Sequence, residues 1–206
     1  MIIYMSDIIV ISNSSICKED FLLRIEKLAE AKPKAIVLRE KHLPESDYED
    51  LAKKVIEICN KYNTQCILHN FPKVAEKLNH KALHLPLQVL ATLTDKEKSQ
   101  YKILGASCHS VEDAVKALKL GCTYITAGHI FDTDCKKGLP GRGLDFLKEV
   151  CSSVSIPVYA IGGISPKNFS MVRNAGADGG CIMSSAMICT NPVSYTHLTL
   201  PTICSV

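Results

Sequence analysis

The stretch from Gly128 to Gly143 combines the residue types that proton transfer on a phosphorylated substrate requires. It reads GHIFDTDCKKGLPGRG, and an apolar, strand-like run at 124–128 leads into its histidine, His129. Imidazole exchanges protons near neutral pH, and the lysines and arginine downstream could hold a phosphate. We therefore predict that His129 is catalytic; the alternative is a structural histidine.

Two further strand ends are rich in small residues and are candidates for phosphate binding. Gly162 and Gly163 end one predicted strand, and Ser184 and Ser185 end the last one. Glycine lets the backbone approach an anion closely, and helix N-termini offer free N–H groups to phosphate. A plain tight turn would also explain the glycine pair.

Polar residues also end the second and third predicted strands. Arg39 and Lys41 lie on the same side of an extended chain and could hold a phosphate or a carboxylate. A solvated charged loop is the alternative. Asn70 could contact a ligand or cap the following turn.

Other residues with chemical potential have ordinary explanations. His109 could be a second titrating group, but helix capping and packing explain it equally well. His69 and His84 lie within strands and are expected to face the helices. Cys135 could be a nucleophile, although nothing in the sequence lowers its pKa, so an inert loop thiol is the alternative.

These residues need a frame of alternating strands and helices. The expected strands are 7–12, 35–39, 65–70, 82–86, 102–107, 124–129, 157–162 and 179–184. The expected helices are 20–31, 47–62, 74–79, 95–100, 110–120 and 166–175, with Ser165 as the N-cap of the last. Eight nearly continuous apolar strands predict an α/β fold, a (β/α)8 TIM barrel. An open doubly wound sheet fits less well, because no Gly-x-Gly-x-x-Gly follows the first strand.

Composition excludes several classes of protein. The 206 residues are 47% hydrophobic and carry a net charge of only +3, which does not indicate nucleic-acid binding. No apolar run is long enough to span a membrane, and residues 1–5 make a poor signal peptide. The ten cysteines contain no Cys-x-x-Cys pair, so we expect reduced thiols, no zinc site and a cytoplasmic protein.

The C-terminal residues do not continue the pattern. Residues 1–192 are predicted to form a single barrel domain, whereas 193–206 are irregular and resemble read-through of a sequencing adapter. A genuine divergent tail is the alternative. If the tail is an artefact, the barrel lacks its final helix.

Several of these segments together resemble one known family, the thiamine phosphate synthase / TenI superfamily. The similarity covers residues 7–188, and its most specific part is His-x-Phe-x-Thr-Asp-Cys-Lys-Lys-Gly. The other segments that carry it are 103–114, 158–163 and 174–179. The histidine-containing stretch resembles the TenI branch, the thiazole tautomerases.

Departures from the synthase pattern also favour that branch. Synthases have Asn-Asp after the third strand and another aspartate after the fourth, both binding magnesium. This chain has Asn70-Phe71 and a Leu-Pro-Leu-Gln run at 85–88 instead. Mg²⁺ prefers carboxylate oxygens, so diphosphate chemistry is not favoured. Synthases also have proline at the position of His129.

The resemblance thus implies a cofactor-free thiazole tautomerase of thiamine biosynthesis, with no metal. The substrate would be 2-carboxy-4-methylthiazol-5(2H)-ylidene ethyl phosphate, and His129 its general base and acid. The glycine pair and both serines would hold the phosphate, while Arg39, Lys41 and Asn70 would meet the carboxylate. Thr133 and Lys136 match substrate-contacting positions of synthases, and Cys135 replaces a hydroxyl residue there.

Three alternatives stay open from the sequence. The chain could be a residual thiamine phosphate synthase, a non-catalytic TenI-type regulatory or binding protein, or another phosphate-sugar barrel enzyme. Beyond its small-molecule substrate, no nucleic acid or membrane partner is expected. The sequence leaves open whether the chain forms a homo-oligomer.

Overall fold

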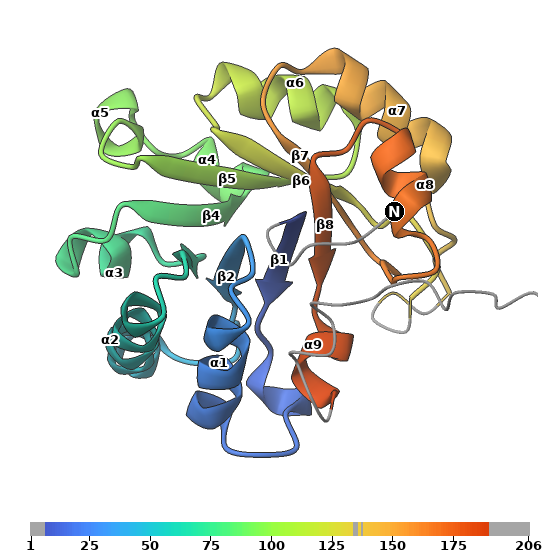
Figure 1. The fold of residues 1–206 in the computed structure, drawn as a ribbon. Coiled ribbons are helices and arrows are strands. Elements are labelled where there is room, and N and C mark those ends of the chain that lie inside the picture. The colour runs from blue at the N-terminus through green and yellow to red at the C-terminus, as the bar shows by residue number, and fades with distance from the viewer. Residues whose placement is uncertain (1–6, 134–135, 137, 190–206) are drawn as a thin grey trace, which may run out of the picture.

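Eight parallel strands close into a barrel in the computed structural model, which describes residues 7–133, 136 and 138–189 (Figure 1). The strands are β1 (Ile8–Ile11), β2 (Ala35–Leu38), β3 (Cys66–His69), β4 (Ala82–Pro86), β5 (Ile103–Cys108), β6 (Tyr124–Gly128), β7 (Val158–Ile161) and β8 (Gly179–Ile182). Each strand pairs with the next, and β8 pairs with β1 to complete the ring. The predicted TIM barrel is confirmed.

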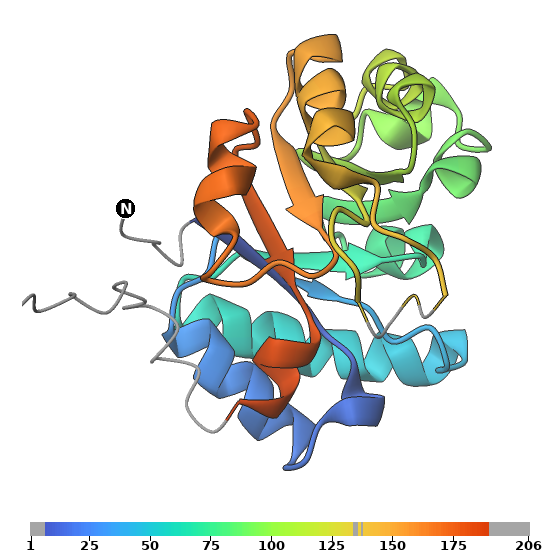
Figure 2. The same ribbon diagram turned by 90° about the vertical axis from the view of Figure 1, so that its right-hand side faces the viewer.

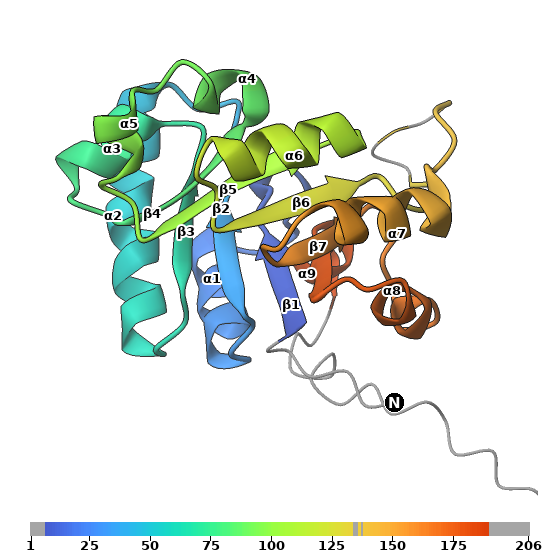
Figure 3. The ribbon, with the colours of Figure 1, turned by 90° about the horizontal axis from the view of Figure 1, so that it is seen from above.

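Helices surround this barrel and follow the strands in chain order. They are η2 (Ser14–Ile16), α1 (Phe21–Glu30), α2 (Glu45–Lys61), α3 (Pro72–Lys77), α4 (Leu87–Leu90), α5 (Asp95–Lys98), α6 (Val111–Lys119), α7 (Gly143–Ser153), α8 (Phe169–Asn174) and α9 (Ser184–Ile188). Seen from above, α6, α7 and α8 lie in sequence around one side (Figure 3). Neither α4 nor α7 was among the predicted helices. A single turn such as α4 is too short to show a helical period.

Helix α8 begins later than the sequence predicts. Ser165 does not cap it, because the Asn168 side chain accepts a hydrogen bond from the Ser165 N–H (2.8 Å). This local bond favours a turn over residues 166–168 instead of helix. Phe169 then starts the helix and is buried.

Two apolar layers hold the barrel together. Side chains such as Leu68, Leu83 and Leu85 point outward and pack under the helices. A second cluster, which includes Ile9, Val37 and Tyr124, fills the barrel interior. Burial on both faces explains why the strands read as continuous apolar runs.

The chain after β8 forms the short helix α9, whereas the sequence predicts strand up to residue 184. Helix α9 lies beside η2, next to α1 (Figure 2). The buried Arg24 of α1 donates a hydrogen bond to the carbonyl oxygen of Ala186 (3.5 Å). The predicted tail, 193–206, lies outside the described residues, so the domain boundary stays a prediction. Among the helices described, none is long and apolar enough to cross a membrane.

Candidate functional site

The predicted site residues all follow the carboxyl ends of barrel strands. In a closed parallel barrel these ends form one rim, where barrel enzymes have their active sites. The residues are Arg39 and Lys41 after β2, Asn70 after β3, His129, Thr133 and Lys136 after β6, Gly162 and Gly163 after β7, and Ser184 and Ser185 after β8.

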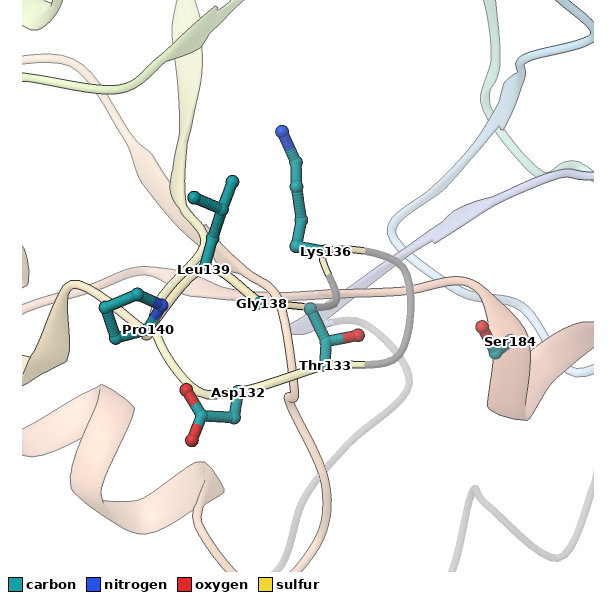
Figure 4. Close-up of a pocket in the computed structure, with 7 residues that line it drawn as sticks. All are labelled: Asp132, Thr133, Lys136, Gly138, Leu139, Pro140 and Ser184. Carbon is teal, nitrogen blue, oxygen red and sulfur yellow. The ribbon is translucent and has the colours of Figure 1, made fainter.

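A pocket of about 680 Å³ lies between the loop after β6 and the start of α9. Its lining residues are Asp132, Thr133, Lys136, Gly138, Leu139, Pro140 and Ser184. In Figure 4 the Thr133 hydroxyl points toward the side of the pocket where Ser184 lies. Three predicted binding residues, Thr133, Lys136 and Ser184, are therefore brought together across about 50 residues of sequence.

His129 does not line this pocket, but one hydrogen bond connects its ring to the pocket wall. Its Nε2 atom lies 3.2 Å from the carbonyl oxygen of Leu139. A carbonyl only accepts, so Nε2 carries the proton. In the neutral ring Nδ1 then has the free lone pair. The backbone carbonyl of His129 accepts from the N–H of Arg142 (2.9 Å), which closes the loop on itself.

Gly162 and Gly163 give the His129 segment room to pass over the end of β7. A Cβ atom on Gly162 would lie 2.3 Å from the Cβ of His129, and one on Gly163 would lie 2.7 Å from the carbonyl oxygen of Asp132. Both glycines also have positive φ angles, +96° and +65°. Close packing therefore requires glycine here. Their predicted contact with phosphate stays a prediction.

Positive charges from two loops gather on this rim. Burial lowers the pKa of Lys41, and the nearby charges of Arg39 and Lys136 lower it further. Like charges that lie close enough to affect one another create a strong preference for an anion. The loops after β2 and β6 thus share one cationic region, although they are nearly 100 residues apart in sequence.

A buried carboxylate, which the sequence analysis did not single out, stabilises the loop that bears Arg39 and Lys41. Glu40 is only 1% exposed. It accepts hydrogen bonds from the hydroxyls of Ser12 and Ser14 (2.6 Å each). The Ser12 hydroxyl in turn accepts from the N–H of Arg39 (2.9 Å). The serine run after β1 was the available signal, because a buried carboxylate needs such donors.

His69 and His84 face the barrel interior, so the prediction that they face the helices is wrong. Their rings stack with centroids 5.8 Å apart. The His84 ring also forms hydrogen bonds with the hydroxyls of Tyr124 and Ser107 (2.9 Å each). The outward positions of β3 and β4 hold Cys66, Leu68, Leu83 and Leu85. Alternation in 82–86 places His84 on the face opposite Leu83 and Leu85, but it does not show which face is inside.

Both interior histidines are neutral at physiological pH. Burial, together with the proximity of His84, Arg39 and Lys41, lowers the pKa of His69 to about 2. Burial lowers the pKa of His84 to about 4. A neutral imidazole below the cationic region adds no further repulsion there.

Asn70 adopts a left-handed conformation with φ of +70°, and its N–H donates to the carbonyl oxygen of His84 (3.1 Å). This geometry agrees with the turn alternative, and its ligand contact stays a prediction. The next residue, Phe71, packs its ring on Tyr48 with centroids 4.3 Å apart. Among the described residues no group of three or more histidine, cysteine, aspartate or glutamate side chains could hold a metal ion.

Two remaining predicted residues receive less support. Ser185 does not line the pocket, and its carbonyl oxygen accepts a hydrogen bond from the N–H of Cys189 (3.1 Å), the residue that follows α9. Cys135 lies outside the described residues.

Comparisons with known proteins agree on one family. The family model of thiamine monophosphate synthase (TMP-TENI) matches residues 8–186. The thiamine-phosphate synthase of Fusobacterium nucleatum is 34% identical over 170 residues, 82% of this chain and 82% of the relative. The thiamine-phosphate synthase of Clostridium tetani is 33% identical over 153 residues, 74% of this chain and 73% of the relative. A thiamine phosphate pyrophosphorylase structure from Pyrococcus furiosus has a TM-score of 0.79 at 27% identity, covering 93% of this chain and 92% of that one.

Proposed function

The chain belongs to the thiamine monophosphate synthase (TMP-TENI) family, and on this premise we propose that it is a thiazole tautomerase of thiamine biosynthesis. The substrate is the non-aromatic 2-carboxy-4-methylthiazol-5(2H)-ylidene ethyl phosphate. A base removes the proton from ring C2, the π electrons shift through the ring, and the exocyclic carbon receives a proton. Atoms and charge balance without any oxidant or second substrate.

The observation that carries this proposal is the histidine at the end of β6. The Leu139 carbonyl accepts a hydrogen bond from the Nε2–H group of His129. Nδ1 is therefore the nitrogen that can accept the C2 proton and later return one. General acid–base catalysis of this kind typically contributes about 10²–10⁴-fold.

The loop after β2 and the pocket supply two different anion contacts. Arg39 and Lys41 lie on the β2 side and suit the carboxylate, whose oxygens would share the negative charge that develops at C2 as the proton leaves. Lys136, with the hydroxyls of Thr133 and Ser184 around the pocket, suits the phosphate. Cations and hydroxyl donors are the usual partners of both groups.

A magnesium ion, which the synthase reaction implies, does not fit the donor set at its expected place. The positions after β3 and β4 hold Asn70-Phe71 and Leu87-Gln88. Phe71 is packed on Tyr48 and Leu87 is buried in the core, so neither offers oxygen to a metal. A hard divalent cation prefers carboxylate ligands. No step of the proposed tautomerisation depends on a metal.

The second candidate is thiamine phosphate synthase itself. The names of the relatives favour it, because proteins 33–34% identical to this chain are called thiamine-phosphate synthases. That reaction couples a pyrimidine diphosphate to the thiazole phosphate and releases inorganic diphosphate. A third outcome, a non-catalytic binding role, would keep the anion contacts without needing His129.

One experiment distinguishes these functions. The protein is incubated with the non-aromatic tautomer in D₂O, and aromatisation is followed by ultraviolet absorbance and NMR. In parallel it receives the pyrimidine diphosphate, the aromatic thiazole phosphate and Mg²⁺, and diphosphate release is measured. Accelerated aromatisation with deuterium at the exocyclic carbon supports the tautomerase, whereas coupling alone would refute it.

The variant His129→Asn tests the role of the histidine. It should bind the aromatic product as the wild type does, by calorimetry, but lose about 10²-fold or more of the aromatisation rate. Full activity in this variant would contradict the assignment of His129. A folded wild type that binds the product without converting the tautomer would favour the binding role.

A further inference from the structure

His109 reaches the peptide group that directly precedes His129. Its Nδ1 atom lies 2.8 Å from the carbonyl oxygen of Gly128. Because a carbonyl only accepts, Nδ1 is the donor, and the ring is held in one orientation. The contact joins the end of β5 to the end of β6, where the register pairs Cys108 with Ala127.

The start of α6 holds the backbone of His109 in place. The N–H of His109 donates to a side-chain oxygen of Asp113 (2.9 Å). The N–H of Asp113 donates back to the hydroxyl of Ser110 (3.1 Å), which is the N-cap residue. This reciprocal cap satisfies donors that a helix start leaves open. The His-Ser-x-x-Asp sequence at 109–113 thus links a helix cap to the neighbouring strand end.

Backbone hydrogen bonds fix the rest of the His129 segment. The His129 carbonyl accepts from Arg142, and the N–H of Ile130 donates to the carbonyl oxygen of Ile161 (2.9 Å). These bonds hold the chain after the Cα of His129. The Gly128 carbonyl lies on the other side of that Cα, where it accepts a hydrogen bond from the His109 ring.

We propose that His109 is a positioning residue for His129, acting through the carbonyl group of Gly128. It does not act on the substrate itself. Rotation of the Gly128–His129 peptide plane would swing the imidazole away from the reacting carbon, and the His109 hydrogen bond prevents this. Small misplacement of a catalytic group can lower a rate by about 10²-fold. This inference rests on the proposed tautomerase function.

Three substitutions at one position test the hydrogen bond. His109→Asn keeps a donor, because its amide nitrogen occupies nearly the same place as Nδ1. His109→Gln moves the donor one bond further along the side chain, and His109→Leu removes it. We expect kcat for aromatisation to fall about tenfold to 10²-fold in the leucine and glutamine variants, with KM within about twofold of the wild type. The asparagine variant should recover most of kcat.

A second readout does not depend on activity. The ring nitrogens of His129 are observed by ¹⁵N NMR in each variant, together with binding of the aromatic product by calorimetry. We expect the ¹⁵N signals of the His129 ring to change in the leucine and glutamine variants but not in the asparagine variant. Product affinity should stay within about twofold, because the pocket residues are not altered.

The outcomes separate this inference from the proposed function. If the wild type lacks tautomerase activity but the His129 signals follow the donor pattern, the positioning role stands and the function fails. Unchanged His129 signals and kcat in His109→Leu would overturn the positioning role. So would equal losses in the asparagine and leucine variants, since one of them retains the donor.

Discussion

Lowering the pH from 7.5 to 5.0 should destabilise the protein through the two histidines inside the barrel. The folded-state pKa of His69 is lowered to about 2 and that of His84 to about 4, from a value of 6.5 in the unfolded chain. Below pH 6.5 the unfolded chain therefore binds protons that the folded barrel does not. The stability that the two neutral histidines contribute is fully present above pH 6.5. It is lost as the pH falls from there toward their folded-state pKa values.

The expected loss follows from these pKa values. Each unit of pH below 6.5 costs about 1.4 kcal/mol for each histidine that stays neutral in the folded state. At pH 5.0 the two groups together lower the free energy of unfolding by about 4 kcal/mol. The half-buried His80, whose pKa burial also lowers, acts in the same direction. A typical domain has only about 5–15 kcal/mol of stability, so the effect is large.

Urea unfolding followed by circular dichroism at several pH values measures this loss. The variant His69→Leu fills the same space with an apolar side chain and removes one of the groups. Between pH 7.5 and 5.0 its free energy of unfolding should fall by about 2 kcal/mol less than that of the wild type. An identical pH dependence in the two proteins would refute the inference that His69 is neutral and buried in the folded barrel.

Two substitutions test how the structure supports the site. Gly162→Ala places a Cβ 2.3 Å from the Cβ of His129 at a φ of +96°, so it should lower both aromatisation and the free energy of unfolding. Gly121→Ala is the matched control, because φ is +87° there but nothing lies within 4 Å; equal effects would mean that strain alone is responsible. Tyr48→Phe removes the hydroxyl that donates to the Leu38 carbonyl and accepts from the His69 N–H (2.8 Å each). It should cost about 1–3 kcal/mol in urea unfolding, and an unchanged midpoint would contradict this.

Much of the barrel architecture could be predicted from the order of the residues. Eight apolar runs separated by helical patterns indicate a parallel barrel, because strands buried on both faces need apolar residues throughout. Polar residues such as Arg39 and His129, placed directly after those runs, then belong to one rim. The capping pattern at Ser110 is also local, and its helix begins at the next residue.

The partners across the rim depend on how the barrel closes. Alternation shows that Ile67 and His69 share a face, but it does not show which face is inside, because both are buried in apolar surroundings. Likewise, the sequence of the glycine pair is compatible with a turn or an anion site. In the structure its closest neighbours belong to the segment that carries His129.

The sequence by itself determined the kinds of groups at the rim and the strands that carry them. The tertiary structure decided that His109 holds the Gly128 carbonyl and that Leu139 holds the Nε2 proton of His129. It also brought Lys136 within reach of the charge of Lys41. The physical reason is that hydrogen bonds and Coulomb forces depend on separation in space over a few ångströms. Only closure of the barrel sets those separations for residues that lie far apart along the chain.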